Sequence, residues 1–143
     1  MKRSHLLTQG LVCVLAAVVL CGCAMFAGGP SDEELITAKL DAWKAGFVAK
    51  DIDAILAVYS DKFTHYEVSD KDGLREFLEG AVDMGYLEDI EVNAEEAEIT
   101  IDGESAVVYP IDLSSAAGSV TIELTFTKEG DDWMVSTMDI EGL

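Results

Sequence analysis

The chain has 143 residues and a mass of 15.4 kDa, with 28 acidic residues against 9 basic ones, so its formal net charge is −19. This length predicts a single domain, and because half of the residues are apolar, disorder of the whole chain is excluded. The acidic excess excludes nucleic acid as a partner and docking on anionic lipid through a basic patch, since both need clustered Lys and Arg.

The first 22 residues are typical of an export signal. A basic start, Met1-Lys2-Arg3, precedes an apolar run over 11–20, which is too short to span a bilayer as a helix. The run ends in Leu20-Cys21-Gly22-Cys23, which resembles the bacterial lipobox. The resemblance implies cleavage after residue 22 and lipid on Cys23. The alternative is an ordinary secretory signal that is cleaved nearby.

Lipid on Cys23 fixes the expected location and domain layout. Two or three acyl chains suffice for stable anchoring to the bacterial membrane. Because Ala24 follows the cysteine, we expect the periplasmic side of the outer membrane if the organism is Gram-negative. Residues 23–30 are then the lipidated Cys and tether, and the domain covers 31–143.

The mature chain offers few groups for metal or redox chemistry. It keeps all 28 acids but only 7 bases, for a net charge of −21, with Cys23 as its only cysteine and His65 as its only histidine. A disulfide, a cysteine metal site and a multi-histidine site are therefore excluded. The motifs of P-loop, Rossmann, serine-hydrolase and zinc-protease sites do not occur. We expect no cofactor.

Local patterns predict helices in the first half of the mature domain. Ser31 and Glu34 form a capping box, and apolar residues then recur every three or four positions up to Phe47. Asp51 is a second cap, and Gly85 is a natural helix stop. The predicted elements are helices from Ser31, over 52–59 and from Ser69 to Gly85, with a short strand over 63–68.

Alternating apolar residues predict four longer strands after the helices. The first runs over 90–101, and its alternation slips by one residue between Asn93 and Glu96, as at a β-bulge. The others alternate over 107–113, 120–126 and 133–140, after turns at Asp102-Gly103, Ala117-Gly118 and Glu129-Gly130-Asp131. This order predicts an α+β fold, with helices on one face of an antiparallel meander.

Two stretches carry a resemblance to a known superfamily. Residues 50–61 (KDIDAILAVYSD) resemble the loop and helix of the NTF2-like superfamily, also called SnoaL-like or ketosteroid-isomerase-like, and residues 128–133 (KEGDDW) resemble its hairpin. With the element order, the resemblance covers about 31–140. It implies a cone-shaped fold, in which three N-terminal helices pack on a curved, bulged four-stranded sheet plus one short strand. This fold hosts enzymes, carriers and assembly domains alike.

The resemblance also suggests catalytic candidates. In ketosteroid-isomerase-like members the proton-abstracting carboxylate lies at the end of the short strand, a position that falls on Glu67, with His65 able to share its proton. However, Trp43 stands where the isomerases place an oxyanion-stabilising Tyr, and the inward series over 120–126 has no acid. The alternative is that Glu67 and His65 face solvent or line the mouth of a pocket.

A cone lined by large side chains predicts a pocket, and its alternative is a plain core. The candidate pocket residues are Trp43, Phe47, Tyr59, Phe63, His65, Glu67, Tyr109 and Met138. We first expect a membrane-anchored, non-catalytic domain that binds a small apolar ligand. The second hypothesis is a dimeric interaction module of the cell envelope, which pairs through the outward residues Thr121, Glu123, Thr125 and Thr127. The third is a lyase or isomerase with Glu67 as base and His65 as its partner.

Acidic residues crowd the first predicted hairpin. They are Glu88, Asp89, Glu91, Glu95, Glu96, Glu98, Asp102 and Glu104. A calcium site is conceivable because hard cations prefer several carboxylates, but no EF-hand spacing occurs. We expect a solvated face and no metal.

Overall fold

The computed structural model describes residues 28–142. The predicted export signal over 1–22 and the predicted lipid on Cys23 lie outside the described residues, so both stay predictions. Within the described part, no helix combines the length and the apolar character that crossing a membrane requires.

The described part holds three helices, α1 (Asp32–Ala49), α2 (Ile52–Leu56) and α3 (Lys71–Asp83). The predicted capping box begins α1, since Ser31 Oγ accepts the Glu34 N–H and the Glu34 carboxylate accepts the Ser31 N–H. The carboxylates of Asp51 and Asp70 each accept a first-turn N–H of α2 and α3. These caps satisfy donors that a helix leaves without an internal partner.

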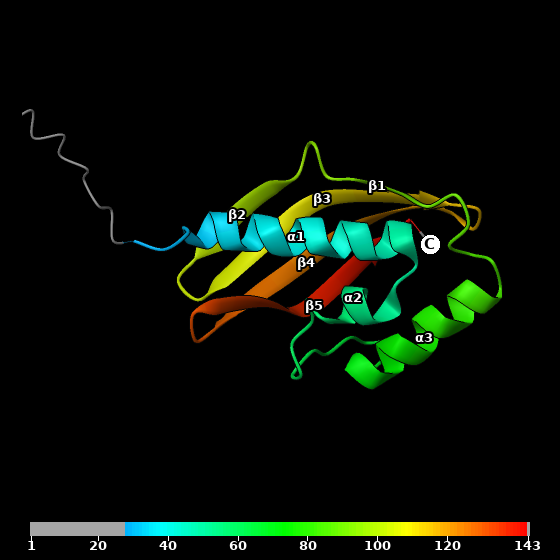
Figure 1. The fold of residues 1–143 in the computed structure, drawn as a ribbon, viewed down its shortest axis with the longest axis horizontal. Helices are drawn as coiled ribbons and strands as arrows, with labels where there is room; N and C mark the ends of the chain where they lie inside the picture. The colour runs from blue at the N-terminus through cyan, green and yellow to red at the C-terminus, as the bar shows by residue number, and fades with distance from the viewer. Residues whose placement is uncertain (1–27, 143) are drawn as a thin grey trace, which may run out of the picture.

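Five strands in the described part form one antiparallel sheet (Figure 1). They are β1 (Glu91–Asn93), β2 (Glu98–Asp102), β3 (Ser105–Ser115), β4 (Gly118–Glu129) and β5 (Asp132–Glu141). Both β1 and β2 pair with β3, which pairs with β4, and β4 pairs with β5. Register shifts interrupt the pairing between Val108 and Ile111 and between Thr125 and Phe126. Such irregularities bend a sheet.

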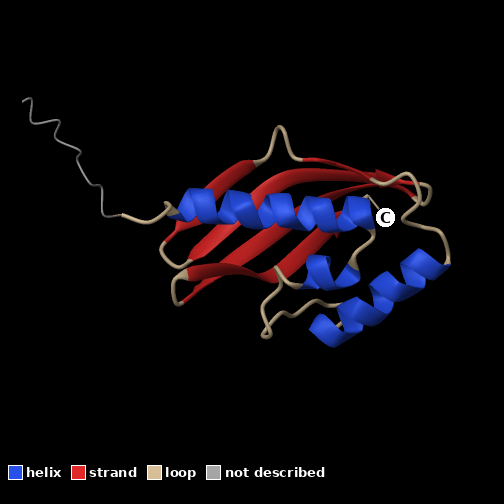
Figure 2. Cartoon of the chain, in the orientation of Figure 1, coloured by secondary structure: helices blue, strands red, loops and turns tan. Residues whose placement is uncertain are grey.

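The helices and the sheet form two layers. Figure 2 shows α1 lying along one face of the sheet, with α2 beside the C-terminal half of α1 and α3 next to α2. The side chains between the layers are buried, among them Ile36 and Trp43 from α1 and Leu124, Phe126 and Trp133 from the sheet. The opposite face of the sheet, called the outer face below, carries no helix in the described part (Figure 2).

The predicted fold class is confirmed, because helices pack on a curved antiparallel sheet of five strands. The fifth strand, however, does not lie where we expected it. Residues 63–68 do not form a strand, because the chain turns at 66–68, where His65 and Ser69 exchange two backbone hydrogen bonds. The extra strand arises because 94–97 divide the first predicted strand into β1 and β2.

The second helix is shorter than its predicted range of 52–59. It ends at Leu56 because the next residues turn toward β5, where Tyr59 forms a bridge with Val135. The backbone N–H groups of Ser60 and Thr64 donate to carbonyls of Val135 and Ser136. These contacts partly cover the edge of β5, which a local helical pattern does not reveal.

Candidate functional site

The predicted pocket residues fill the interior of the cone. Trp43, Phe47, Tyr59, Phe63 and Met138 are at most 7% exposed. Trp43 Nε1–H donates to Tyr59 Oη at 3.0 Å, and the Tyr59 hydroxyl lies 3.6 Å from Met138 Sδ, to which it donates. Edge-on ring contacts join Trp43 to Phe47 and Tyr59 to Phe63, with centroids 4.7 and 4.9 Å apart. These side chains contact one another as a core does.

The two catalytic candidates do not meet in this interior. His65 is buried, but its Nδ1 accepts the backbone N–H of Glu67 at 3.2 Å, and its ring lies against Tyr66 and Phe63. Glu67 itself is exposed. The expected strand would have placed Glu67 and His65 on one face, whereas the turn separates them. The prediction that Glu67 lines the cone is therefore corrected.

Tyr109 also lies outside the cone. Alternation had predicted that Val107 and Tyr109 face inward with Ile111. Pro110 has no N–H to donate to a neighbouring strand, and the β3–β4 register shifts between Val108 and Ile111. As a result Val108 and Ile111 are buried, and Tyr109 is 40% exposed on the outer face. There its hydroxyl lies 3.4 Å from the Glu141 carboxylate.

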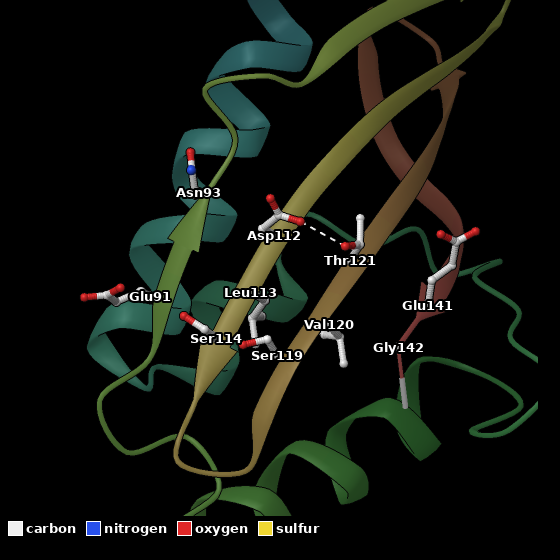
Figure 3. A pocket seen from close by; sticks show the side chains of 10 residues that line it. All are labelled: Glu91, Asn93, Asp112, Leu113, Ser114, Ser119, Val120, Thr121, Glu141 and Gly142. Carbon is white, nitrogen blue, oxygen red and sulfur yellow. Dashed lines mark hydrogen bonds between the residues drawn. The ribbon is translucent and has the colours of Figure 1, made fainter.

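Cross-strand registers place polar side chains in rows over the outer face. One row runs across four strands through Asn93, Asp112, Thr121 and Glu141. Asp112 accepts a hydrogen bond from the Thr121 hydroxyl at 2.9 Å, as Figure 3 shows. A hollow of about 440 Å³ lies over this end of the sheet (Figure 3). Its lining residues are Glu91, Asn93, Asp112, Leu113, Ser114, Ser119, Val120, Thr121, Glu141 and Gly142.

A second hollow, of about 590 Å³, lies on the first turns of α1. It is lined by Ser31, Glu33, Glu34, Thr37, Ala38 and Asp41. None of the predicted pocket residues lines either hollow. Both hollows therefore lie on the outside of the fold, and polar and apolar groups line them together.

Negative charges surround the Tyr109 hydroxyl on the outer face. The carboxylate of Glu141 beside the hydroxyl raises the pKa of Tyr109 above its usual range, and partial burial and the charges of Glu123 and Asp112 add to this effect. A phenol resists ionisation where negative charges already lie close to it.

Acidic residues are spread across this face without a basic neighbour. Apart from Glu129 and Asp132 beside the β4–β5 turn, the registers place seven of them outward, namely Glu91, Glu98, Asp102, Asp112, Glu123, Asp139 and Glu141. No Lys or Arg points outward from the five strands of the described part. Among residues 28–142, no group of three or more His, Cys, Asp or Glu side chains is arranged to hold a metal ion.

The sequence pattern indicated that two of these acids point outward, but the site predicted from the sequence did not include them. Asp112 stands between the apolar Ile111 and Leu113, and Asp139 stands between Met138 and Ile140. The alternation that was applied to Thr121 and Glu123 in β4, applied equally to β3 and β5, would have placed these acids on the same outward face.

Comparison with solved structures gives several similar folds. An NTF2-like protein of unknown function from Pseudomonas putida KT2440 has a TM-score of 0.66 at 15% identity, covering 80% of this chain and 90% of that chain. A ketosteroid isomerase-like protein from Erwinia carotovora atroseptica SCRI1043 has a TM-score of 0.58 at 18% identity, covering 74% and 92%.

A putative calcium/calmodulin-dependent protein kinase type II association domain from Thiobacillus denitrificans ATCC 25259 is also similar. Its TM-score is 0.59 at 16% identity, covering 75% of this chain and 94% of that chain. No protein-family model matches the sequence, and no curated protein matches it. At these identities structural likeness establishes the fold alone. The chain therefore has the NTF2-like fold that the sequence resemblance implied.

Proposed function

We propose that this chain is a non-catalytic binding domain of the cell envelope, anchored through lipid on Cys23, which docks a protein partner on the outer face of its sheet. The observation that supports the proposal most is a contrast between two surfaces. The interior of the cone is filled by side chains that are at most 7% exposed, whereas the outer face is open, polar and hollowed at one end.

The geometry gives little support to the enzyme alternative. General-base catalysis by Glu67 needs its carboxylate within hydrogen-bond reach of a bound substrate. Glu67 is exposed on a turn, and the indole N–H of Trp43 is already hydrogen-bonded to Tyr59. A base and an oxyanion donor therefore do not converge on one empty space.

The apolar-ligand hypothesis requires a change in the core. A ligand in the cone would have to separate Trp43, Tyr59 and Met138, and so break a buried hydrogen bond between two aromatic side chains. An unpaired buried donor costs about 1–3 kcal/mol. We therefore rank this hypothesis below docking on the outer face.

The comparisons are compatible with a binding role. One similar structure is described as a putative association domain, a name that describes assembly rather than catalysis. Because one fold hosts many functions, this likeness adds only an analogy to the argument from geometry.

Native mass spectrometry tests the proposal against the apolar-ligand hypothesis. The protein would be extracted from the membranes of its source organism and measured intact. We expect the mass of the lipidated chain, alone or with a protein partner. A small molecule bound in stoichiometric amount would overturn the proposal if it occupies the cone. The Tyr59→Phe variant tests that location, because the substitution loosens the cone and should release a ligand bound there.

A further inference from the structure

No basic side chain points outward from the five described strands, whereas acidic side chains lie on both sides of the molecule. Five bases on the helix side or in the inner layer form ion pairs there: Lys39 with Asp132, Lys50 with Glu88, Lys71 with Asp61, Arg75 with Asp53, and Lys128 with Asp32. The seven outward acids named above form none of the ion pairs found in the described part. The outer face therefore has an excess of negative charge that the fold leaves without counter-charge.

Two of these acids oppose each other directly. Glu123 on β4 and Asp139 on β5 are register partners, and both point outward because their neighbours Leu124 and Met138 are buried. Like charges opposite one another destabilise a sheet. A cationic group placed between the two strands would remove this repulsion.

The same region offers other groups that bind cations. The exposed ring of Tyr109 lies among carboxylates, and an aromatic face attracts ammonium and guanidinium groups. Asp112 and Glu141 line the hollow at this end of the sheet, where they can accept charge-assisted hydrogen bonds.

A second copy of this chain is a poor occupant of the surface. In a two-fold symmetric dimer each copy presents the same patch, so the acids of one outer face would lie against those of the other. Like-charge juxtaposition across an interface costs several kcal/mol. The homodimer of the second hypothesis is therefore disfavoured on this face.

We infer that the partner is a protein that presents a Lys- and Arg-rich segment to the outer face, with Tyr109, Asp112, Glu123 and Glu141 as the principal contacts. This inference rests on the proposed function, because it names the chemistry of the partner at the same surface. Charge complementarity supports the assignment, since the exposed acids lack counter-charge and the strand registers bring them together on one face.

Binding of an oligolysine peptide, followed by fluorescence anisotropy at low salt, tests the inference. The triple variant D112N/E123Q/E141Q removes three charges from the outer face with amides of nearly the same shape. The matched control D41N/E76Q/D83N removes three exposed charges from α1 and α3, outside the ion pairs above. We expect about a tenfold loss of affinity in the first variant, which three lost exposed pairs would give, and much less in the control.

An equal loss in both variants would show attraction to the net charge alone and would overturn the inference. Circular dichroism of both triple variants checks that they are folded, and NMR shift changes confined to β3, β4 and β5 would locate the peptide. The inference and the proposed function can fail separately. If the native partner docks on the outer face through an apolar or acidic segment, the docking surface stands and the basic partner does not.

Discussion

Tyr59 is the side chain on which the closed interior of the cone depends most. Its hydroxyl accepts the indole N–H of Trp43 and donates to Met138 Sδ, and burial raises the pKa of Tyr59 far above its usual range, so the hydroxyl stays protonated. Because the Tyr59→Phe substitution leaves a buried donor unpaired, we expect it to lower the free energy of unfolding by about 1–3 kcal/mol.

Urea unfolding measures this loss, and Tyr66→Phe is the matched control. Tyr66 is 72% exposed, so its hydroxyl can bond to water and the substitution should leave stability nearly unchanged. If the two variants were equally stable, the cone would not be a packed core. That result would favour the hypothesis that the cone binds an apolar ligand.

Asp32 ties the start of α1 to the hairpin between β4 and β5. Its carboxylate accepts hydrogen bonds from Lys128 Nζ at 2.8 Å and from the Trp133 indole at 3.0 Å, and these bonds hold the pKa of Asp32 below its usual value. A depressed carboxyl pKa adds stability above the unfolded-state value, about 3.9 for Asp, and this contribution is lost as the pH falls through the lower folded value.

We therefore expect the Asp32→Asn variant to lose less stability than the native chain between pH 6 and pH 2. Thermal unfolding across this range measures the difference. Asp41→Asn is the control, because Asp41 is exposed on the same helix and lies outside the ion pairs of the described part. Parallel pH profiles for D32N and the native chain would contradict the role given to Asp32.

At the scale of elements, Gly46 sets how closely α1 approaches α2. A Cβ at this position would lie 2.9 Å from both the backbone nitrogen and Cγ1 of Ile55, closer than atoms can pack. We expect Gly46→Ala to destabilise the fold by about 1–3 kcal/mol, despite the better helix propensity of Ala.

Gly80 on α3 provides the opposite case. The nearest atom to a Cβ there is the mobile end of Met84, at 4.0 Å. Gly80→Ala should therefore stabilise the domain by about 0.5–1 kcal/mol, because Ala loses less backbone entropy in a helix. Denaturant unfolding of the pair measures both effects, and the same sign in both variants would refute this account of the helix crossing.

Local chemistry explains which elements were predictable from the sequence. The capping box at Ser31 and the glycine turns at Gly103 and Gly130 depend on neighbours in sequence, and each is found where expected. The path of residues 60–64 was not predictable in this way, because Ser60 and Thr64 donate to carbonyls of β5, about seventy residues away.

The site was harder to predict than the fold, for a related reason. Placing Tyr109 required the register of β3 against β4, which shifts beside Pro110. Recognising the core character of Trp43 required its contact with Tyr59. In both cases the local sequence pattern did not determine the environment of the side chain. Tertiary contacts decided whether that side chain is exposed to solvent or buried in the core.

At the scale of the whole molecule, uncompensated charge limits stability. Repulsion between Glu123 and Asp139 opposes strand pairing, so Glu123→Gln should raise the free energy of unfolding by about 0.2–1 kcal/mol at low salt. The gain should shrink in high salt, which screens exposed charges. Thermal unfolding at two salt concentrations measures this effect. A similar gain from Glu76→Gln on α3 would show that only net charge matters.

A gain in stability from removing Glu123 would also bear on function. Natural chains keep destabilising groups where binding or catalysis needs them. The outer face would then carry negative charge that lowers the stability of the isolated domain. This is expected of a surface whose charge is neutralised when a partner binds.

Site-specific photo-crosslinking in the cells of the source organism tests docking on the outer face. A photoreactive residue would replace Thr125, near the middle of the outer face, or Ala45, exposed on α1, and adducts would be identified by mass spectrometry. We expect one defined protein adduct from position 125 and none from position 45. Adducts from position 45 alone, or equally from both positions, would contradict docking on the outer face.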